Sequence, residues 1–295
     1  MQHFDYEKVS SLQEAFDVVS AAKGASVFMA GGTDLLVLIK EGKIRPQRVI
    51  DVKGINGMDR FEISKEEFSV GSLTTIRMLE TSLAAREKVP LLAQAAAKLG
   101  SVQVRNKATI GGNLCNASPS AEMAPALLAL EAQAEIYGKT GTRVVDLCEF
   151  FIGPGSTILE EGEILTSLKI PLNSHCQGST YYKLTTRKAM DIAFVGVAVL
   201  LELDGDDRIN KARIALGAVA PTPIRVPSAE KFLEGKVLSR EAAQESAGLA
   251  AQACQPISDL RASAEYRREM VNNLCQRGLL AAYREATGSS EGNGR

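Results

Sequence analysis

Two glycine turns, about eighty positions apart, are the parts of this chain best suited to chemistry. The first, Ala-Gly-Gly-Thr-Asp at residues 30–34, follows an apolar, strand-like run at 26–29, and the second, Thr-Ile-Gly-Gly-Asn at 109–113, comes a few residues after another strand-like run, Val-Gln-Val at 102–104. Paired glycines adopt positive φ without steric cost, and consecutive N–H groups of such a turn can converge on an anion. The two turns together predict one extended ligand with a diphosphate held from both sides.

Polar neighbours strengthen both turns, although each also has a simpler interpretation. Thr33 and Asp34 stand where the N-cap of the following helix is expected, with Asp34 bracing the turn through backbone N–H groups. The alternative is a tight strand-to-helix connection without a ligand. Arg105 and Lys107 place two cations before the second turn, as phosphate ligands or as solvated surface charges. Asn113, Asn116, Ser118, Ser120 and Glu122 add hydrogen-bonding side chains beyond it.

Other familiar catalytic and nucleotide-binding patterns are missing from the sequence. No G-x-G-x-x-G follows a strand, and Gly-Lys-Thr at 138–140 has Gln133 where a P-loop needs glycine, so it predicts a turn between two strands. Gly-Pro-Gly-Ser-Thr at 153–157 loses a donor at its proline and predicts a structural loop. With only two histidines, a histidine triad or a zinc site is excluded as the basis of function. The chemistry must come from a bound cofactor, and no side chain is assigned as catalytic.

The composition describes an ordinary soluble protein. A net charge of -1 argues against nucleic acid as a partner, and the longest apolar run, at 192–201, is about half of a membrane span. The first six residues have neither the basic stretch nor the apolar core of a secretion signal, which favours the cytoplasm. The five cysteines are scattered without a C-x-x-C, so we expect mostly buried free thiols and no metal site in this chain. Cys115, just after the second turn, is the exception to watch.

The 295 residues suggest about two domains. Ser11 and Glu14 form a capping box ahead of a helix to residue 22, and strands at 26–30 and 48–52 complete a β-α-β unit. Strands at 67–71, 134–137 and 164–170 alternate with alanine-rich helices at 91–99 and 121–130. A polar boundary at 171–179 precedes three strands (179–185, 191–203 and 212–219), with a hairpin turn at 204–207, and three helices (228–233, 240–254 and 263–286).

Residues 30–35 and 109–122, with 187–193 and 218–225, resemble the FAD-binding subunit of molybdenum hydroxylases, a family that includes xanthine, nicotinate and carbon monoxide dehydrogenases. The resemblance covers essentially the whole chain. It implies an α+β fold in which a PCMH-type FAD-binding domain of two subdomains, about 1–55 and 56–177, precedes a C-terminal domain at 178–286. That second domain has a three-stranded antiparallel sheet and a helical bundle, and 287–295 form a disordered tail.

The resemblance also implies the site. One side of the FAD diphosphate lies against 28–35 and the other against 109–113, Glu122 is near the ribityl chain, and Leu165 and Lys183 are beside the flavin. Some relatives stack the adenine on an aromatic near Leu99, whereas this chain has no aromatic between Phe68 and Tyr137. The implied cofactor-binding residues are Phe28, Met29, Ala30, Gly31, Gly32, Thr33, Asp34, Leu35, Thr109, Ile110, Gly111, Gly112, Asn113, Glu122, Leu165 and Lys183.

As an expectation from the same resemblance, a large molybdenum-pterin subunit hydroxylates a substrate, and a small subunit passes the electrons through two 2Fe–2S clusters to FAD on this chain. NAD⁺ or another acceptor then takes them, in a dimer of heterotrimers. Thr33-Asp34 and the Asn-Leu-Cys-Asn run at 113–116 favour the xanthine and nicotinate branch over the carbon monoxide branch. The alternatives are a flavin-free scaffold subunit and a stand-alone flavin oxidase.

Overall fold

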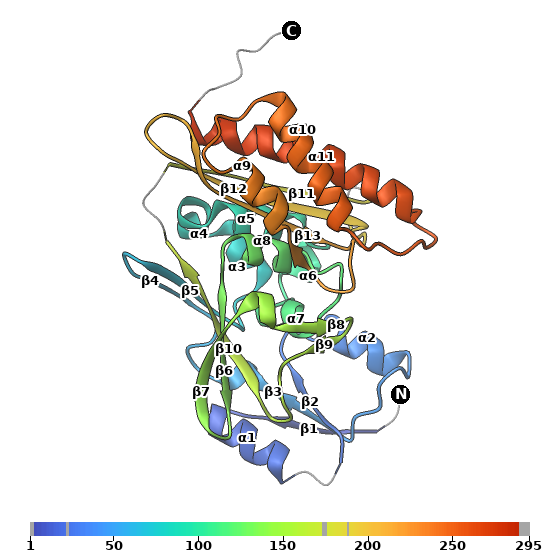
Figure 1. The fold of residues 1–295 in the computed structure, drawn as a ribbon. Helices are drawn as coiled ribbons and strands as arrows, with labels where there is room; N and C mark the ends of the chain where they lie inside the picture. Colours follow the sequence, from blue (N-terminus) through green and yellow to red (C-terminus); the bar gives the residue numbers. More distant parts are fainter. Residues whose placement is uncertain (1–2, 22–23, 173–175, 188, 289–295) are drawn as a thin grey trace.

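The computed structural model describes residues 3–21, 24–172, 176–187 and 189–288. At the N-terminal end, β1 (Asp5–Lys8), β3 (Arg48–Asp51) and β2 (Ser26–Met29) form a parallel sheet in that order, with α1 (Leu12–Ser20) and α2 (Leu35–Lys40) between the strands along the chain (Figure 1). The predicted β-α-β unit is confirmed as β2-α2-β3. Ser11 caps α1 as predicted, because its hydroxyl accepts a hydrogen bond from Glu14 N.

A second, antiparallel sheet runs through the middle of the molecule. Its order is β4-β5-β10-β6-β7, and 3₁₀ turn η1 (Val52–Gly54) leads into it from the first sheet. The predicted strands at 67–71, 134–137 and 164–170 are confirmed as β5, β6 and β10, and residues 139–140 turn between β6 and β7 as expected. The bounds are β4 Phe61–Ile63, β5 Glu67–Gly71, β6 Gln133–Gly138, β7 Gly141–Asp146, η2 Leu147–Glu149, β8 Phe151–Gly153, β9 Ser156–Thr157 and β10 Ile164–Pro171.

Short helices fill the space between this sheet and the C-terminal part of the chain. Their bounds are α3 Ile76–Thr81, α4 Leu83–Lys88, α5 Pro90–Lys98, α6 Val102–Arg105, α7 Ile110–Cys115 and α8 Met123–Ala129. The strand expected at 102–104 is wrong: this segment is α6, capped by the Ser101 hydroxyl, which accepts from Val104 N. Three residues give too little periodicity to separate a strand from a single helical turn.

The C-terminal sheet has four antiparallel strands, β11 (Cys176–Leu184), β12 (Val195–Leu203), β13 (Ile209–Gly217) and β14 (Ile224–Arg225). The sequence predicted three strands, and the structure adds a fourth, the short edge strand β14. Residues 218–223 connect β13 to it. Helices α9 (Pro227–Leu233), α10 (Arg240–Ala253) and α11 (Ala264–Ala286) follow as predicted. Of the expected tail, 289–295 lie outside the described residues.

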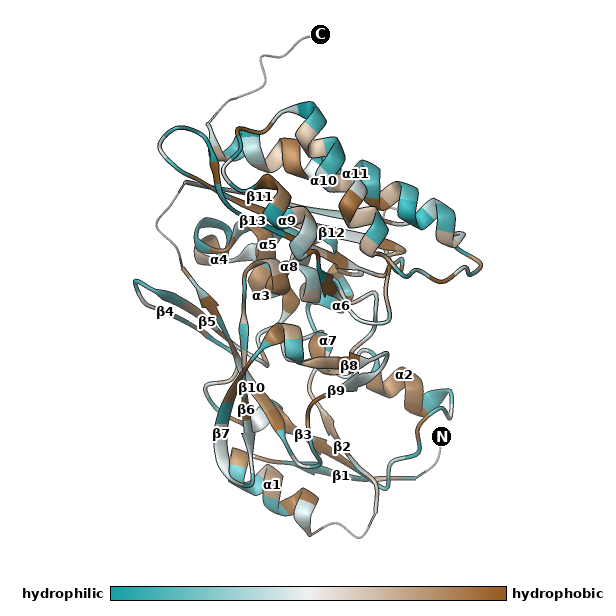
Figure 2. Ribbon diagram, viewed as in Figure 1, coloured by the Kyte–Doolittle hydropathy of each residue, from teal (hydrophilic) through white to brown (hydrophobic). Residues whose placement is uncertain are grey.

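Helices cover both faces of this sheet, which explains why β12 is fully buried and carries no polar side chain except Glu202. α11 packs on one face so closely that a Cβ at Gly178 would lie 1.8 Å from the Ala282 carbonyl oxygen. On the other face, a Cβ at Gly217 would lie 2.7 Å from Pro125 Cγ of α8. In Figure 2 the outer helices α10 and α11 carry hydrophilic residues between hydrophobic ones, as expected of helices with one face on a sheet.

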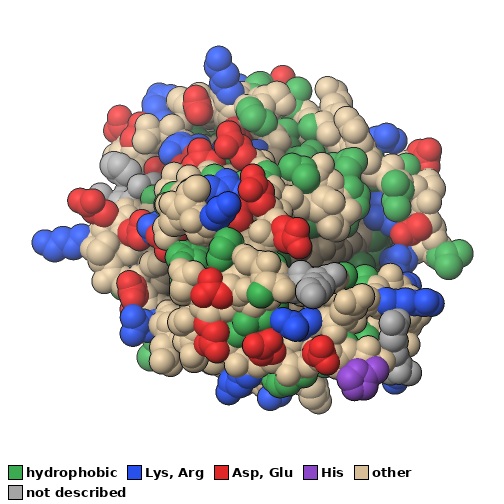
Figure 3. Space-filling model, turned by 90° about the horizontal axis from the view of Figure 1, so that it is seen from below, with side chains coloured by type: hydrophobic (Ala, Val, Ile, Leu, Met, Phe, Trp, Pro, Cys, Tyr) green, Lys and Arg blue, Asp and Glu red, His purple; other side chains and the backbone are tan. Residues whose placement is uncertain are grey.

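On the face seen from below, acidic and basic side chains are interspersed (Figure 3). None of the described helices is long and apolar enough to cross a membrane. Cys254 and Cys275 are buried free thiols as expected, but Cys148 and Cys115 are exposed, so the expectation of mostly buried thiols is wrong for these two.

Candidate functional site

The first glycine turn connects β2 to α2 in a conformation that requires its glycines. Gly32 has a φ of +71°, a region that side chains with a Cβ adopt only under strain. A Cβ at Gly31 would lie 2.0 Å from the carbonyl oxygen of Lys107. This turn, residues 30–34, is called the glycine loop below, and it is in direct contact with the segment that precedes the second turn.

The hydrogen bonds of the glycine loop are strongly unequal. Three of its carbonyl oxygens have donors: Gly32 O accepts from Leu36 N, Asp34 O from Leu38 N and Ala30 O from Lys53 Nζ. The N–H groups of residues 31–35, by contrast, find no acceptor among the described residues. Because backbone donors require a partner, this row of amides is free to bind an acceptor-rich group such as a phosphate.

Asp34 does not brace this loop in the way the sequence suggested. It occupies the N-cap position of α2, but its side chain makes no capping hydrogen bond and its own backbone is already helical. Its carboxylate lies 3.4 Å from the Thr33 hydroxyl, which donates to it. The prediction of a loop held through backbone N–H groups is wrong, and those groups stay available.

The second glycine turn is not a loop but the first turn of α7. Its amides are already paired: Ile110 N donates to Thr74 O at 3.0 Å, Gly111 N to Ser72 O at 2.8 Å and Gly112 N to Thr109 Oγ1 at 3.1 Å. The glycines allow α7 to approach residues 72–74, since a Cβ at Gly111 would lie 2.6 Å from Ser72 Cβ. The expectation that these N–H groups converge on an anion is therefore wrong.

The two turns nevertheless line one cavity of about 660 Å³, a size usual for ligand sites. Three expected site residues, Met29, Ile110 and Lys183, do not line it. Sequence reasoning missed others that do, among them Ser72, Val104, Leu159 and Met190, because only the fold brings them together. The expected residues that line the cavity are Phe28, Ala30, Gly31, Gly32, Thr33, Asp34, Leu35, Thr109, Gly111, Gly112, Asn113, Glu122 and Leu165.

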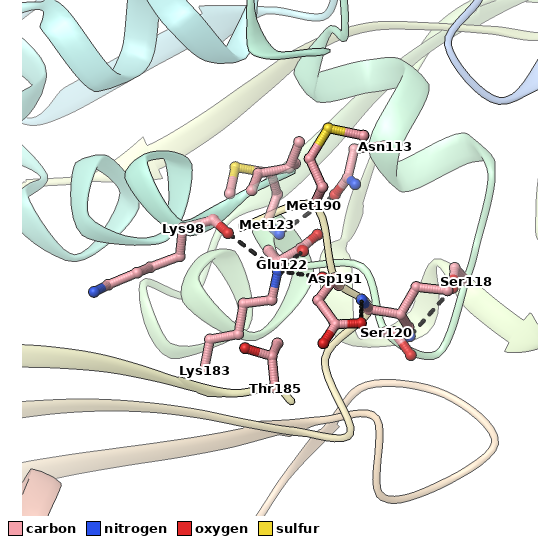
Figure 4. A network of polar contacts seen from close by, with 12 residues as sticks. Lys98, Asn113, Ser118, Ser120, Glu122, Met123, Lys183, Thr185, Met190 and Asp191 are labelled. Atoms are coloured by element: carbon pink, nitrogen blue, oxygen red, sulfur yellow. Dashed lines mark hydrogen bonds and ion pairs between the residues drawn. The ribbon is translucent and has the colours of Figure 1, made fainter. Parts of the chain in front are cut away.

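At one end of this cavity, Glu122 and Lys183 meet across the two halves of the chain (Figure 4). Lys183 Nζ of β11 lies 2.7 Å from Glu122 Oε1 at the start of α8, and both side chains are nearly buried. The same ammonium donates to Lys98 O at 3.1 Å and to Asp191 O at 2.8 Å. Burial raises the pKa of Glu122, while Lys183 acts in the opposite direction. Lys183 thus supports the cavity wall from behind.

The chain on either side of residue 188, at 185–187 and 189–192, folds against the same end of the cavity. Asp191 organises it: its carboxylate accepts from Thr186 Oγ1 and from Arg187 N, and these hydrogen bonds lower its pKa to about 2. Met190 adopts a φ of +54°, and its N–H donates to Gly100 O at 3.2 Å. Met190 and Asp191 therefore become part of the cavity lining.

The sequence left Arg105 either as a phosphate ligand or as a solvated charge, and the structure shows neither. Its side chain is buried against Glu80, with Nε–Oε2 at 2.8 Å and Nη2–Oε1 at 3.0 Å, and Nη1 donates to Leu99 O at 2.8 Å. It fixes the backbone around Leu99. Lys107 stays exposed, and it contributes its carbonyl oxygen to the contact with Gly31.

We expect Glu80→Gln to lower the free energy of unfolding by about 3 kcal/mol at neutral pH, because Arg105 would keep a buried charge without its counter-ion. Although burial opposes it, hydrogen bonding to Arg105 and Arg77 lowers the pKa of Glu80. The stabilisation is therefore present above the unfolded pKa of about 4.3 and is lost as pH falls through the lower folded value. Urea unfolding at several pH values tests this.

The matched control is Glu62→Gln, since Glu62 pairs with Arg60 at 3.2 Å while both side chains are exposed. This change should cost about 0.5 kcal/mol or less. Equal losses in the two variants, or a Glu80→Gln loss that does not shrink in acid, would contradict the assignment.

Four carboxylates contribute to the cavity lining, those of Asp34, Glu122, Glu163 and Asp191, and no lysine or arginine among the described residues does. Three of the four are paired with a basic side chain outside the lining: Glu122 with Lys183, Glu163 with Arg143 and Asp191 with Arg187. A bound phosphate must therefore depend on neutral donors rather than on a cationic clamp, in agreement with the free amides of residues 31–35.

Comparison with known proteins identifies the family of the chain. Residues 2–173 match the family model described as the FAD binding domain in molybdopterin dehydrogenase, and residues 180–282 match the CO dehydrogenase flavoprotein C-terminal domain. The chain belongs to the FAD-binding subunits of the molybdenum hydroxylase family. Its cofactor is FAD.

Relatives of this family are similar over nearly their whole length. The chain is 32% identical to the carbon monoxide dehydrogenase medium chain of Hydrogenophaga pseudoflava, covering 95% of this chain and 97% of that one. It is 30% identical to the xanthine dehydrogenase FAD-binding subunit of Escherichia coli O157:H7, covering 96% and 97%. The solved structure of the Hydrogenophaga carbon monoxide dehydrogenase that lacks the Mo-pyranopterin moiety superposes with a TM-score of 0.93 at 32% identity, covering 96% and 98%. Quinoline 2-oxidoreductase from Pseudomonas putida 86 gives 0.91 at 32%, covering 97% and 98%.

Proposed function

We propose that the free amides of residues 31–35 bind the diphosphate of FAD and that the flavin lies in the part of the cavity lined by Glu122 and Leu165, with Lys183 behind Glu122. The unpaired row of N–H groups is the main support for this placement, because these groups are the part of the lining best suited to bind an anion. Thr109, Gly111, Gly112 and Asn113 contribute a wall and side chains opposite the glycine loop, but not a second row of amides.

This placement changes the part of FAD that Leu99 is expected to contact, since the family resemblance put the adenine near Leu99. The carbonyl oxygen before it, Lys98 O, accepts a hydrogen bond from Lys183, and Lys183 belongs to the flavin end. Leu99 and Met190, whose N–H is bound to Gly100 O, therefore flank the flavin rather than the adenine in this proposal. The absence of an aromatic near Leu99 then concerns the flavin end.

FAD supplies the redox chemistry, and the chain supplies binding, orientation and electrostatics. The glycine loop fixes the diphosphate, and the buried Glu122–Lys183 pair holds α8 and β11 at fixed positions beside the flavin. Leu99, Leu165 and Met190 contribute apolar side chains to the cavity lining. No side chain needs to transfer a proton for electrons to pass.

Within the family, we propose the following assembly. A large molybdenum-pterin subunit oxidises the substrate, and a small subunit with two 2Fe–2S clusters delivers electrons to this FAD, in a dimer of heterotrimers in the cytoplasm. NAD⁺ or another acceptor receives them. We keep the xanthine and nicotinate branch on the basis of Thr33-Asp34 and residues 113–116. Overall similarity does not favour it, since relatives named for carbon monoxide, glyceraldehyde and xanthine match at 30–32% identity.

The test is to purify the chain with its partners and to denature the complex. The preparation should be yellow, release FAD rather than FMN, and contain a molybdenum chain and an iron–sulfur chain. After anaerobic reduction, NAD⁺ should restore the oxidised flavin spectrum if it is the acceptor, and a quinone should do so if it is not. A colourless preparation without nucleotide would contradict the proposal and favour a flavin-free scaffold, while yellow protein without partner chains would favour a stand-alone oxidase.

A further inference from the structure

The glycine loop is held from outside the cavity by a lysine that the family resemblance did not include. Lys53 lies in η1, directly after β3, and its Nζ donates to the carbonyl oxygen of Ala30 at 2.9 Å. The same Nζ lies 2.8 Å from Asp51 Oδ1. Because β3 pairs with β2 in parallel and Asp51 is opposite Met29, the end of β3 delivers this ammonium to the start of the loop.

Asp51 fixes the position of that ammonium. Its carboxylate is almost completely buried, and it also accepts from Lys53 N at 2.9 Å and from the Tyr6 hydroxyl at 2.5 Å. Burial alone would raise the pKa of Asp51, but the hydrogen bonds from Lys53 and Tyr6 outweigh it and lower the pKa. The carboxylate is therefore charged near neutral pH, and the lysine side chain has one preferred place.

The charges around the cavity indicate what the ammonium group of Lys53 contributes. Four carboxylates line the cavity, three of them paired with a basic side chain outside it, and no lysine or arginine of the described segments lines it, so the lining holds no cation for a diphosphate. Lys53 Nζ contacts the backbone of the glycine loop without lining the cavity, with its side chain 46% exposed. Two of its three N–H groups are directed to Ala30 O and Asp51, which leaves the third without a fixed partner in these contacts.

We propose that Lys53 is the positioning residue of the diphosphate loop. It holds the Ala30 carbonyl so that the amides of residues 31–35 face the cavity, and it supplies positive charge next to a site whose own lining holds no lysine or arginine among the described residues. Asp51 and Tyr6 hold Lys53 in turn. The inference rests on the proposed placement of the diphosphate, and it adds the residues that orient the loop.

The experiment measures the affinity of the flavin-free full chain for FAD, by quenching of flavin fluorescence, at low and high salt. Lys53→Met should raise the dissociation constant about ten- to a hundredfold at low salt and flatten its salt dependence, since a charge-assisted contribution is lost. Lys53→Arg, which keeps the charge and a donor, should restore binding to within about threefold. Lys43→Met, which removes an exposed lysine paired with Glu41 at the end of α2, should leave both quantities unchanged.

Unchanged affinity and salt dependence in Lys53→Met would overturn the proposal. So would a Lys53→Arg variant that binds as weakly as Lys53→Met while both lose thermal stability, because Lys53 would then be structural only. The Gly32→Val variant distinguishes a failure of the role of Lys53 from a failure of the proposed diphosphate placement. If Gly32→Val abolishes binding while Lys53→Met does not, only the role of Lys53 fails. If neither affects binding, the diphosphate lies elsewhere and the placement itself fails.

Discussion

Gly32→Val should give a folded chain that retains less than about a hundredth of the FAD affinity of the wild type. Valine at a φ of +71° is strained by about 1–3 kcal/mol, and its Cβ would lie 3.3 Å from Leu36 Cδ1. The loop would relieve this strain by rotating its peptides away from the ligand. Losing two amide–phosphate hydrogen bonds, each about 1.5–3 kcal/mol, is enough for the expected effect. The measurement is the ratio of flavin to protein after gel filtration, with the dissociation constant.

The chain offers a close control for the backbone strain. Gly42 has the same φ of +71°, but a Cβ there would meet nothing within 4 Å, and it lies beyond the end of α2. Gly42→Val should lose a similar amount of thermal stability and keep its FAD. Should both variants lose flavin equally, strain rather than the diphosphate site would be responsible. Wild-type flavin content in Gly32→Val would refute the assignment of the loop.

The sequence was sufficient to predict most of the strands and the C-terminal helices, for a physical reason. In residues 67–71 and 164–170, apolar and polar side chains largely alternate, and this alternation matches which side chains the sheet buries. The helices at 240–253 and 264–286 have serine caps whose hydroxyls accept from the third following amide, a local interaction that a sequence shows directly.

Several of the errors concern groups whose partner is remote in the sequence. The two glycine turns look alike in the sequence, yet residues 72–74 take the amides of the second turn and leave those of the first free. Arg105 was a plausible phosphate ligand until the fold placed Glu80 beside it, and Lys53 had no recognisable role until β3 brought it to Ala30. A sequence indicates which groups can bind a ligand, but the tertiary fold decides which of them are already occupied.

Lys183→Met should lower the free energy of unfolding by about 3–5 kcal/mol at neutral pH and weaken FAD binding. The substitution leaves Glu122, whose side chain is only 11% exposed, as a buried charge without a counter-ion, and breaking a buried pair from one side has this cost. It also removes the donor that Lys98 O and Asp191 O share, so the cavity end near Leu99 and Met190 loses its anchor. Urea unfolding and flavin content measure the two effects.

The pH dependence and a second variant identify the cause. Burial raises the pKa of Glu122 above its unfolded value, and without Lys183 this effect is unopposed, so the folded state binds the proton more tightly than the unfolded state. The penalty of Lys183→Met should therefore be largest above the raised folded pKa and shrink as pH falls below it.

Lys183→Met with Glu122→Gln should be more stable than Lys183→Met alone. Lys211→Met, which breaks the half-exposed pair with Glu131, should cost about 1 kcal/mol or less and show no such recovery in acid. If the Lys183→Met penalty were independent of pH and unaffected by Glu122→Gln, the lysine would act through packing rather than through the charge of Glu122.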